Sequence, residues 1–212
     1  MNDESSVKVW DPLLRVFHWA LVFLFLVSYI SGEEESMIHV WSGYGIVGLL
    51  IFRFIWGILG PKYARFSNFI YSPQETMAYA RGVLSGQAKR YLGHNPLGGL
   101  MVIALLVSLS MTTLTGMMLY GAEEGKGPLA EFMQAELSMP QLISLAQADD
   151  DDDYEYEHEY EEGESELLEE THEFFANFTV FLIVFHLAGV LFESFVHRES
   201  LVSAMLHGYK RG

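Results

Sequence analysis

Four long apolar runs, separated by polar stretches, form the main pattern of the chain. They cover residues 13–31, 37–59, 96–120 and 173–196. Each run is close to the roughly 20 residues that an α-helix needs to cross a bilayer. Asp3 and Glu4 lie where a signal peptide would be basic, and no small-x-small cleavage site follows the first run, so it is interpreted as a retained span rather than a signal peptide. The pattern predicts an all-α integral membrane protein, a four-helix bundle forming one membrane domain over residues 1–212.

The positively charged residues predict how the helices are oriented. Eleven of the twelve Lys and Arg residues lie near the N-terminus, from the end of the second span to residue 95, or after the fourth span. The exception is Lys126, between the third and fourth spans. Because Lys and Arg concentrate in cytoplasmic loops, both termini and the 60–95 loop are predicted to be cytoplasmic. The 121–171 segment is then a long periplasmic insertion.

The 60–95 loop is predicted to contain a short helix. Ser72, Pro73 and Glu75 stand in the order of a helix start: a Ser cap, a proline at the first helical position and Glu at the third. The sequence TMAYARGVL continues with a mild apolar stripe, which favours a helix on the cytoplasmic membrane surface. His94, in GHNPLGG, is predicted to cap the turn into the third span.

The tract 149–170 differs from the rest of the chain in its charge. Half of the 212 residues are hydrophobic, yet the formal net charge is −16. Fourteen acids and no Lys or Arg lie in the tract 149–170, so the rest of the chain carries only −2. The apolar, nearly neutral body excludes an acidic soluble enzyme and a nucleic-acid binder. The acidic tract is interpreted as a solvated linker, a docking surface for a basic partner, or a weak cation-binding segment.

The absence of cysteine narrows the possible cofactor chemistry. It excludes zinc–thiolate, iron–sulfur and covalently attached haem sites, so any metal must be held by His, Met or carboxylate. An ionisable side chain inside a membrane span needs a partner or a function. Four histidines lie inside the predicted spans or at their outer starts: His18, His39, His172 and His186.

These four histidines are predicted to form two pairs at two depths. His172 and His186 are fourteen residues apart, so on one helix they face within roughly 40° of each other and lie roughly 21 Å apart along the axis. His39 begins its span on the outer side, as His172 does, and His18 shares the inner half with His186. Each pair, His39 with His172 and His18 with His186, would supply two axial ligands to a haem iron. His197 shares the face of His186 but lies at the water boundary.

Three further residues are candidates for contact with such a cofactor. Gly43, among other small residues, leaves room for a flat macrocycle, although small residues equally allow close helix packing. Arg15 and Arg53 could pair with haem propionates or a quinone headgroup, or they could extend to the cytoplasmic interface.

Five segments of the chain resemble the bacterial cytochrome b561 family, which includes the cytochrome b subunits of nickel–iron hydrogenases. They are RVFHW, IHVWSGYGIVGLLIFRFIWG, GHNPLGGLM, the fourteen-spaced THE…FH, and the ending HRESLVSAMLHGYKRG. The resemblance covers the chain except about residues 121–170. It implies a bacterial inner-membrane protein with two non-covalent b-type haems, exchanging electrons between the quinone pool and a partner. Matched by motif, the family's axial ligands fall on the same four histidines.

Two functions follow as alternatives. The first is electron transfer between quinone or quinol and a periplasmic redox protein, with a c-type cytochrome favoured by the acidic tract and the direction of flow left open. The chain would act as a carrier or as the membrane subunit of a quinol:acceptor oxidoreductase, and a dimer is compatible with either. The second is a divalent metal-ion transporter that uses the intramembrane histidines and an acidic ion-collecting loop. Against it, no carboxylate lies in the middle of a span.

Overall fold

The computed structural model describes residues 6–32, 36–135 and 153–212, with side chains given for all of these except 153–164. The described chain is mostly helical, and four of its helices are long and apolar enough to cross a membrane. These are α1 (Pro12–Ile30), α2 (Met37–Leu59), α4 (Pro96–Glu124) and the apolar part of α6 (Asp153–His197), which is Ser165–His197. The four predicted spans are therefore confirmed, and the second has the predicted bounds.

A polar residue just before the first apolar run caps the start of α1. Asp11 caps α1, because its Oδ1 accepts from the backbone N–H of Leu14 at 3.1 Å and proline occupies the first helical position. Inside α4, hydroxyl groups bond back to carbonyls one turn earlier, as Thr112 Oγ1 does to the Ser108 oxygen at 2.9 Å. Such bonds satisfy hydroxyl groups that hydrocarbon cannot hydrate.

The helix predicted in the 60–95 loop is confirmed as α3 (Pro73–Leu84). Ser72 Oγ accepts from the backbone N–H of Glu75, and the Glu75 carboxylate accepts from the backbone N–H of Ser72, which completes a capping box. A short 3-10 turn, η2 (Phe66–Asn68), precedes it. The location of α3 on a membrane surface stays a prediction.

The chain divides into two compact units, to which α4 and α6 both contribute residues. The first unit comprises Met1–Val107 and Thr179–Gly212, and the second comprises Ser108–Phe178. In the first unit α1 and α2 pack together, and Leu24 fills the space beside Gly45. The prediction of one membrane domain over residues 1–212 stays a prediction.

A terminal ribbon in the first unit was not predicted. Strand β1 (Ser6–Lys8) pairs antiparallel with β2 (Tyr209–Arg211), with Val7 opposite Lys210. Between α6 and β2 lies the short helix α7 (Leu201–His207), which ends at Gly208 in the left-handed conformation at φ 91°. The Gly208 carbonyl accepts from the backbone N–H groups of Val9 and Trp10, so the two ends of the chain are joined by backbone hydrogen bonds.

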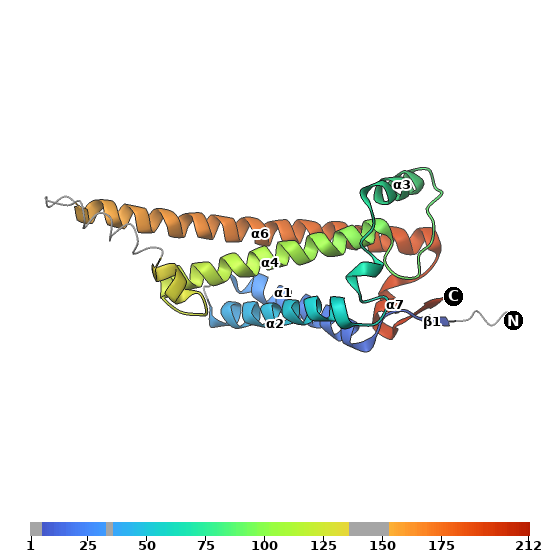
Figure 1. Ribbon diagram of the computed structural model, residues 1–212, viewed down its shortest axis with the longest axis horizontal. Coiled ribbons are helices and arrows are strands. Elements are labelled where there is room, and N and C mark those ends of the chain that lie inside the picture. Colours follow the sequence, from blue (N-terminus) through green and yellow to red (C-terminus); the bar gives the residue numbers. More distant parts are fainter. Residues whose placement is uncertain (1–5, 33–35, 136–152) are drawn as a thin grey trace. The chain divides into compact units, whose positions relative to one another are not determined.

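The tract 149–170 was predicted to be a loop, but from residue 153 onward it is part of helix α6. Helix α6 begins at Asp153, twenty residues before the predicted start of the fourth span, and Figure 1 shows it as one uninterrupted ribbon. The residues 149–152 lie outside the described part. Glu is a good helix former, and acidic residues near a helix N-terminus interact favourably with its dipole, so this composition extends the helix.

Candidate functional site

His39 lies in the first turn of α2 and is held by the backbone of α1. Its Nδ1 lies 2.9 Å from the carbonyl oxygen of Ser28 and 3.4 Å from the hydroxyl of the same residue. A carbonyl oxygen only accepts, so Nδ1 carries the hydrogen of this bond. In the neutral ring the lone pair is then on Nε2, the arrangement that second-sphere carbonyls impose on metal-binding histidines.

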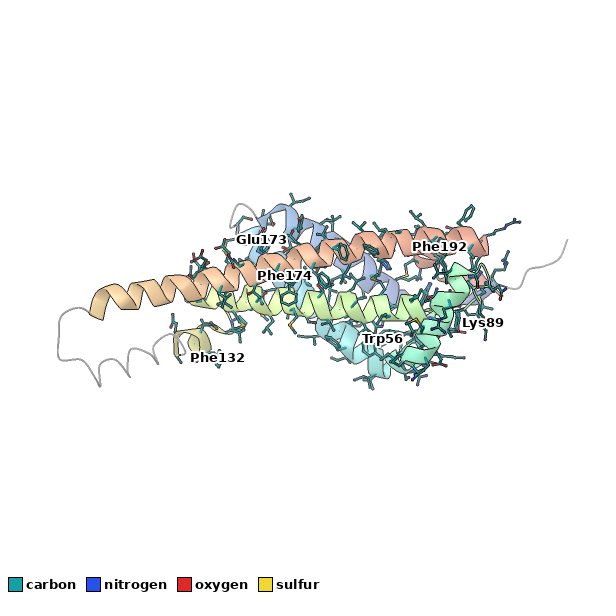
Figure 2. All side chains as sticks on the ribbon, turned by 90° about the horizontal axis from the view of Figure 1, so that it is seen from above. Trp56, Lys89, Phe132, Glu173, Phe174 and Phe192 are labelled. Carbon is teal, nitrogen blue, oxygen red and sulfur yellow. The ribbon has the colours of Figure 1, made fainter. Side chains whose placement is uncertain are left out.

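His172 is held in the same manner in the second unit. Its Nδ1 lies 2.9 Å from the carbonyl oxygen of Thr112 and 3.2 Å from Oγ1 of Thr115. The ring lies so close to Gly116 that a Cβ added there would be 2.8 Å from its Cε1. Figure 2 labels Glu173, the residue that follows His172 on α6. The Thr112 bond again makes Nδ1 the donor and leaves the lone pair of the neutral ring on Nε2.

His18 on α1 and His186 on α6 both belong to the first unit, and their pairing stays a prediction. The His18 Nδ1 is buried and has no hydrogen-bond partner among the described residues. His39 belongs to the first unit and His172 to the second, and their pairing stays a prediction.

Open space adjoins two of these histidines. Gly43 follows His39 by one turn of α2, and Gly189 follows His186 by one turn of α6. A Cβ built on either glycine meets no described atom within 4 Å. The helix faces that carry these histidines therefore leave room beside them.

Arg53 is the most deeply buried of the predicted site residues. It is 2% exposed, and its guanidinium carbon lies 4.6 Å from the centre of the Phe66 ring and 5.7 Å from that of Phe69. Its Nη1 has no hydrogen-bond partner among the described residues. Arg15, at the start of α1, donates from Nη1 to the Leu206 carbonyl, while its Nε is buried without a partner in the same part of the chain.

The predicted capping role of His94 is wrong. Asn95 caps α4 instead, because its Oδ1 accepts from the backbone N–H of Gly98 at 2.7 Å. The His94 ring packs between Trp10 and Phe69, with ring centres 4.8 Å and 4.7 Å away. Asn is a stronger N-cap than His because its short side chain reaches the first free N–H groups. Histidine instead supplies a flat ring that fits between two aromatic rings.

A second polar cluster surrounds Glu199 in the first unit. Its carboxylate accepts from the backbone N–H of Arg211 at 2.7 Å and from Arg90 Nη2 at 3.2 Å, and Lys210 Nζ lies 3.8 Å away. Burial alone would raise the pKa of Glu199, but these hydrogen bonds and positive charges hold it below its usual range. Lys210 also donates to the Tyr91 carbonyl at 3.2 Å. This cluster ties the terminal ribbon to the loop before α4.

Sequence reasoning missed the partners that orient His39 and His172. Ser28 and Thr112 are the two residues whose carbonyls hold His39 and His172. Both carry hydroxyl groups and lie in apolar helices, which is a weak signal. Nothing in the sequence says which hydroxyl-bearing residue faces which histidine, because that depends on helix packing.

The fold and these side chains define a class: helical membrane proteins with oriented histidines inside the spans. The family model for prokaryotic cytochrome b561 matches residues 9–208. The chain therefore belongs to the prokaryotic cytochrome b561 family. It is an integral membrane protein that binds haem b and transfers electrons.

Curated relatives agree with this assignment at low identity. Each is described as a probable Ni/Fe-hydrogenase B-type cytochrome subunit. The protein from Azotobacter chroococcum is 23% identical over 240 aligned positions, which cover 99% of this chain and 90% of the relative. The protein from Cupriavidus necator is 25% identical over 234 positions, covering 97% and 87%. The protein from Azotobacter vinelandii is 23% identical over 240 positions, covering 99% and 90%. No solved structure matches the chain.

The described residues fit haem b. Axial ligation needs an imidazole nitrogen with a lone pair, and the carbonyl bonds of His39 and His172 provide it. The buried Nδ1 of His18 has no partner within the described protein, as expected where a further group completes the site. The open faces beside Gly43 and Gly189 are where a flat macrocycle can approach the helices.

The alternative of a divalent metal transporter gains no support. In the described ranges no group of three or more His, Asp or Glu side chains is arranged to hold a metal ion. The family assignment points instead to haem b and electron transfer.

Proposed function

We propose that this protein transfers electrons between the quinone pool and a periplasmic redox partner through two b-type haems. His18 and His186 are the axial ligands of one haem, here called the inner haem. His39 and His172 are those of the other, the outer haem. Both termini and α3 lie on the cytoplasmic side, and the 121–171 segment lies on the periplasmic side. A pair of irons at two depths suits transfer across the membrane rather than along it.

One observation carries this proposal: His39 and His172, at the predicted outer ends of their spans, are each held by the same kind of hydrogen bond. His39 and His172 each donate from Nδ1 to a backbone carbonyl of another helix, at 2.9 Å in both cases. A single buried histidine can bond a carbonyl in this way without being a ligand, so the support comes from the repetition of the arrangement. Two rings oriented alike, in two different helices, support a shared role as ligands.

The side chains have separable tasks in this account. Haem b, when bound, supplies an iron that gains and loses one electron. The Ser28 and Thr112 carbonyls hold the imidazoles of His39 and His172 and make their Nε2 atoms more basic. The apolar residues of the four spans keep water away from the macrocycles, which affects the reduction potentials.

The acidic tract 149–170 supports a positively charged partner on the periplasmic side. Fourteen acids without a Lys or Arg attract a basic protein over roughly the 8 Å Debye length at physiological salt. A c-type cytochrome is the partner that best matches this charge. The relatives named as hydrogenase cytochrome subunits indicate a membrane-associated redox enzyme as the other candidate.

The first experiment is a reduced-minus-oxidised visible spectrum of the purified protein, with haem counted per chain. We expect b-type bands, two haems per chain and reduction by a quinol. Protein made with ample haem that shows no haem absorbance would exclude the proposal. Zinc or manganese uptake into vesicles by the same preparation would favour the transporter instead.

The second experiment separates the docking and linker interpretations of the tract. A variant lacking residues 149–170 should keep both haems but exchange electrons more slowly with a basic cytochrome at low salt. The difference from the intact protein should fade as salt rises, because screening removes the attraction. Equal rates at low salt would assign the tract to a linker.

A further inference from the structure

Six buried side-chain nitrogen atoms in the first unit lack hydrogen-bond partners among the described residues. One each belongs to His18, Arg90 and His197, and the three that carry this inference are Nη1 of Arg53, Nε of Arg15 and Nδ1 of His94. They come from three separate segments: α2, the first turn of α1, and the loop before α4. Buried donors are nearly always paired in folded proteins, so these three indicate a group that the protein chain does not provide.

Arg53 sets the charge that this group must have. Its guanidinium is always protonated and is 2% exposed, in contact with the rings of Phe66 and Phe69. Cation–π contacts alone compensate little of the cost of burying a charge. Asp11 acts on Arg53 through its charge, but its Oδ1 accepts from Trp56 Nε1 at 3.2 Å, and no hydrogen bond joins the two residues in the described chain (Figure 2 labels Trp56). Asp11 supplies one negative charge near Arg53, and its Oδ2 is buried without a partner in the described chain, so what Arg53 Nη1 lacks is a hydrogen-bond acceptor, which a bound carboxylate would provide.

His94 is a neutral group beside this positive charge. Burial, and after it the charges of Arg53 and Lys210, lower the pKa of His94 to about 3. His186 and His18 also act on it, so His94 lies within electrostatic range of both predicted ligands of the inner haem. Its ring is fixed between Trp10 and Phe69, which holds Nδ1 in one place. A neutral imidazole in the Nδ1–H form can donate to an anion without adding a second buried charge.

Arg15 also belongs to the first unit and lies next to a predicted haem ligand on α1. It precedes His18 by one turn on α1, so the two side chains share a helix face. Its Nη1 donates to the carbonyl of Leu206, which leaves Nε directed elsewhere. The charge of Arg15 and the charge of Arg53 would together match two carboxylates.

We propose that Arg53, Arg15 and His94 bind the propionate carboxylates of the inner haem, and that Arg53 raises the reduction potential of that haem. This inference rests on the proposed function, because it requires the haem held by His18 and His186. Two permanent carboxylates compensate two permanent guanidinium charges, whereas a neutral quinone headgroup compensates neither. A positive charge held near the iron favours the reduced state, which carries one positive charge fewer.

The test compares four variants of the full chain, purified with haem and depleted of quinone: Arg53→Gln, Arg53→Lys, His94→Gln and Arg65→Gln. The readouts are haem per chain and the midpoint potential of each haem, assigned with the His18→Ala and His39→Ala variants. We expect Arg53→Gln to lower the potential of the inner haem and to leave the outer haem unchanged. Arg53→Lys keeps the charge and should restore most of the potential. Arg65 is exposed, so Arg65→Gln is the matched control without effect.

Haem labelled with ¹³C in the propionate carboxyl groups provides a second readout that does not require a stable variant. Redox-difference infrared bands of these groups should respond to reduction in the unaltered protein, and those of one haem should move in His94→Gln. If Arg53→Gln does not hold haem, the infrared bands of the unaltered protein and of His94→Gln, together with the potential of Arg53→Lys, still test whether these residues bind the propionates.

Several results would overturn the inference while leaving the proposed function intact. One is two bound haems with unchanged potentials in Arg53→Gln. Another is a shift that appears only when quinone is added back, which would assign the three donors to the quinone headgroup. A third is propionate bands that do not respond to His94→Gln or to Arg53→Lys. Absence of haem from the unaltered protein is a different outcome and would contradict the proposed function itself.

Discussion

Replacing Gly116 with alanine should displace His172 without changing the histidine itself. A Cβ at this position would lie 2.8 Å from Cε1 and 3.1 Å from Nδ1 of His172, whereas ordinary contact begins at 3.4 Å. The ring must therefore move by about 0.6 Å, the shortfall between these distances. The atoms nearest to the added Cβ all belong to the His172 side chain, and a side chain moves more easily than a packed helix backbone, so the imidazole rather than α4 is expected to yield.

The size of the effect follows from the bond that this movement breaks. The His172 Nδ1 lies 2.9 Å from the Thr112 carbonyl, and a retreat of about 0.6 Å takes it to the limit of a hydrogen bond. Loss of such a second-sphere partner costs about 10- to 100-fold in metal affinity, or about 1.4–2.8 kcal/mol. Gly116→Ala should therefore weaken the outer haem by this factor and leave the inner haem in place.

The assay is haem per chain during titration with a competing haem acceptor, with the two haems distinguished by their potentials. Gly48→Ala is the matched control, because a Cβ at Gly48 meets nothing within 4 Å and Gly48 lies half a turn round α2 from His39. If Gly116→Ala holds the outer haem as tightly as Gly48→Ala does, the hydrogen bond from His172 to the Thr112 carbonyl does not contribute to haem binding. If it loses the inner haem instead, the assignment of His172 is wrong.

Three further predictions concern the parts of the chain around the site. Asn95→Ala should lower the thermal stability by about 1 kcal/mol through loss of the α4 cap, measured by thermal melting in detergent, and a melt equal to the unaltered protein would contradict the capping role. Glu199→Gln should destabilise the protein by about 2 kcal/mol near neutral pH, because a partly buried carboxylate with charged donors is lost. The pKa of Glu199 is lower in the folded state than the unfolded value of about 4.3, so its contribution is present above that value and lost as the pH falls through the folded pKa. Melts of Glu199→Gln should therefore converge with those of the unaltered protein in acid, and a constant difference down to pH 3 would refute this.

The membrane spans could be predicted from the sequence because their signal is local. An apolar run such as 37–59 has no other stable arrangement, and α2 begins and ends at these residues. The α3 start was equally local, since Ser72 and Glu75 satisfy each other's backbone N–H groups and Pro73 occupies the first helical position, all within a single turn. In both cases all the residues that decide the structure are neighbours in the chain.

Other features depended on distant residues and could not be predicted in this way. The terminal ribbon joins three-residue strands about 200 positions apart, and strands so short carry no periodic signal. The role of His94 is decided by Trp10 and Phe69, and that of Ser28 by its neighbour His39. The extension of α6 to Asp153 was missed because a charge run predicts solvent exposure without distinguishing helix from coil.

The pairing of ligands is the central claim, and one measurement tests it most directly. Each of His18, His39, His172 and His186 is replaced singly by alanine, and the haem that remains is identified by its midpoint potential and counted per chain. The account predicts that His18→Ala and His186→Ala lose the same haem, while His39→Ala and His172→Ala lose the other. Loss of one and the same haem in His18→Ala and His39→Ala would contradict it.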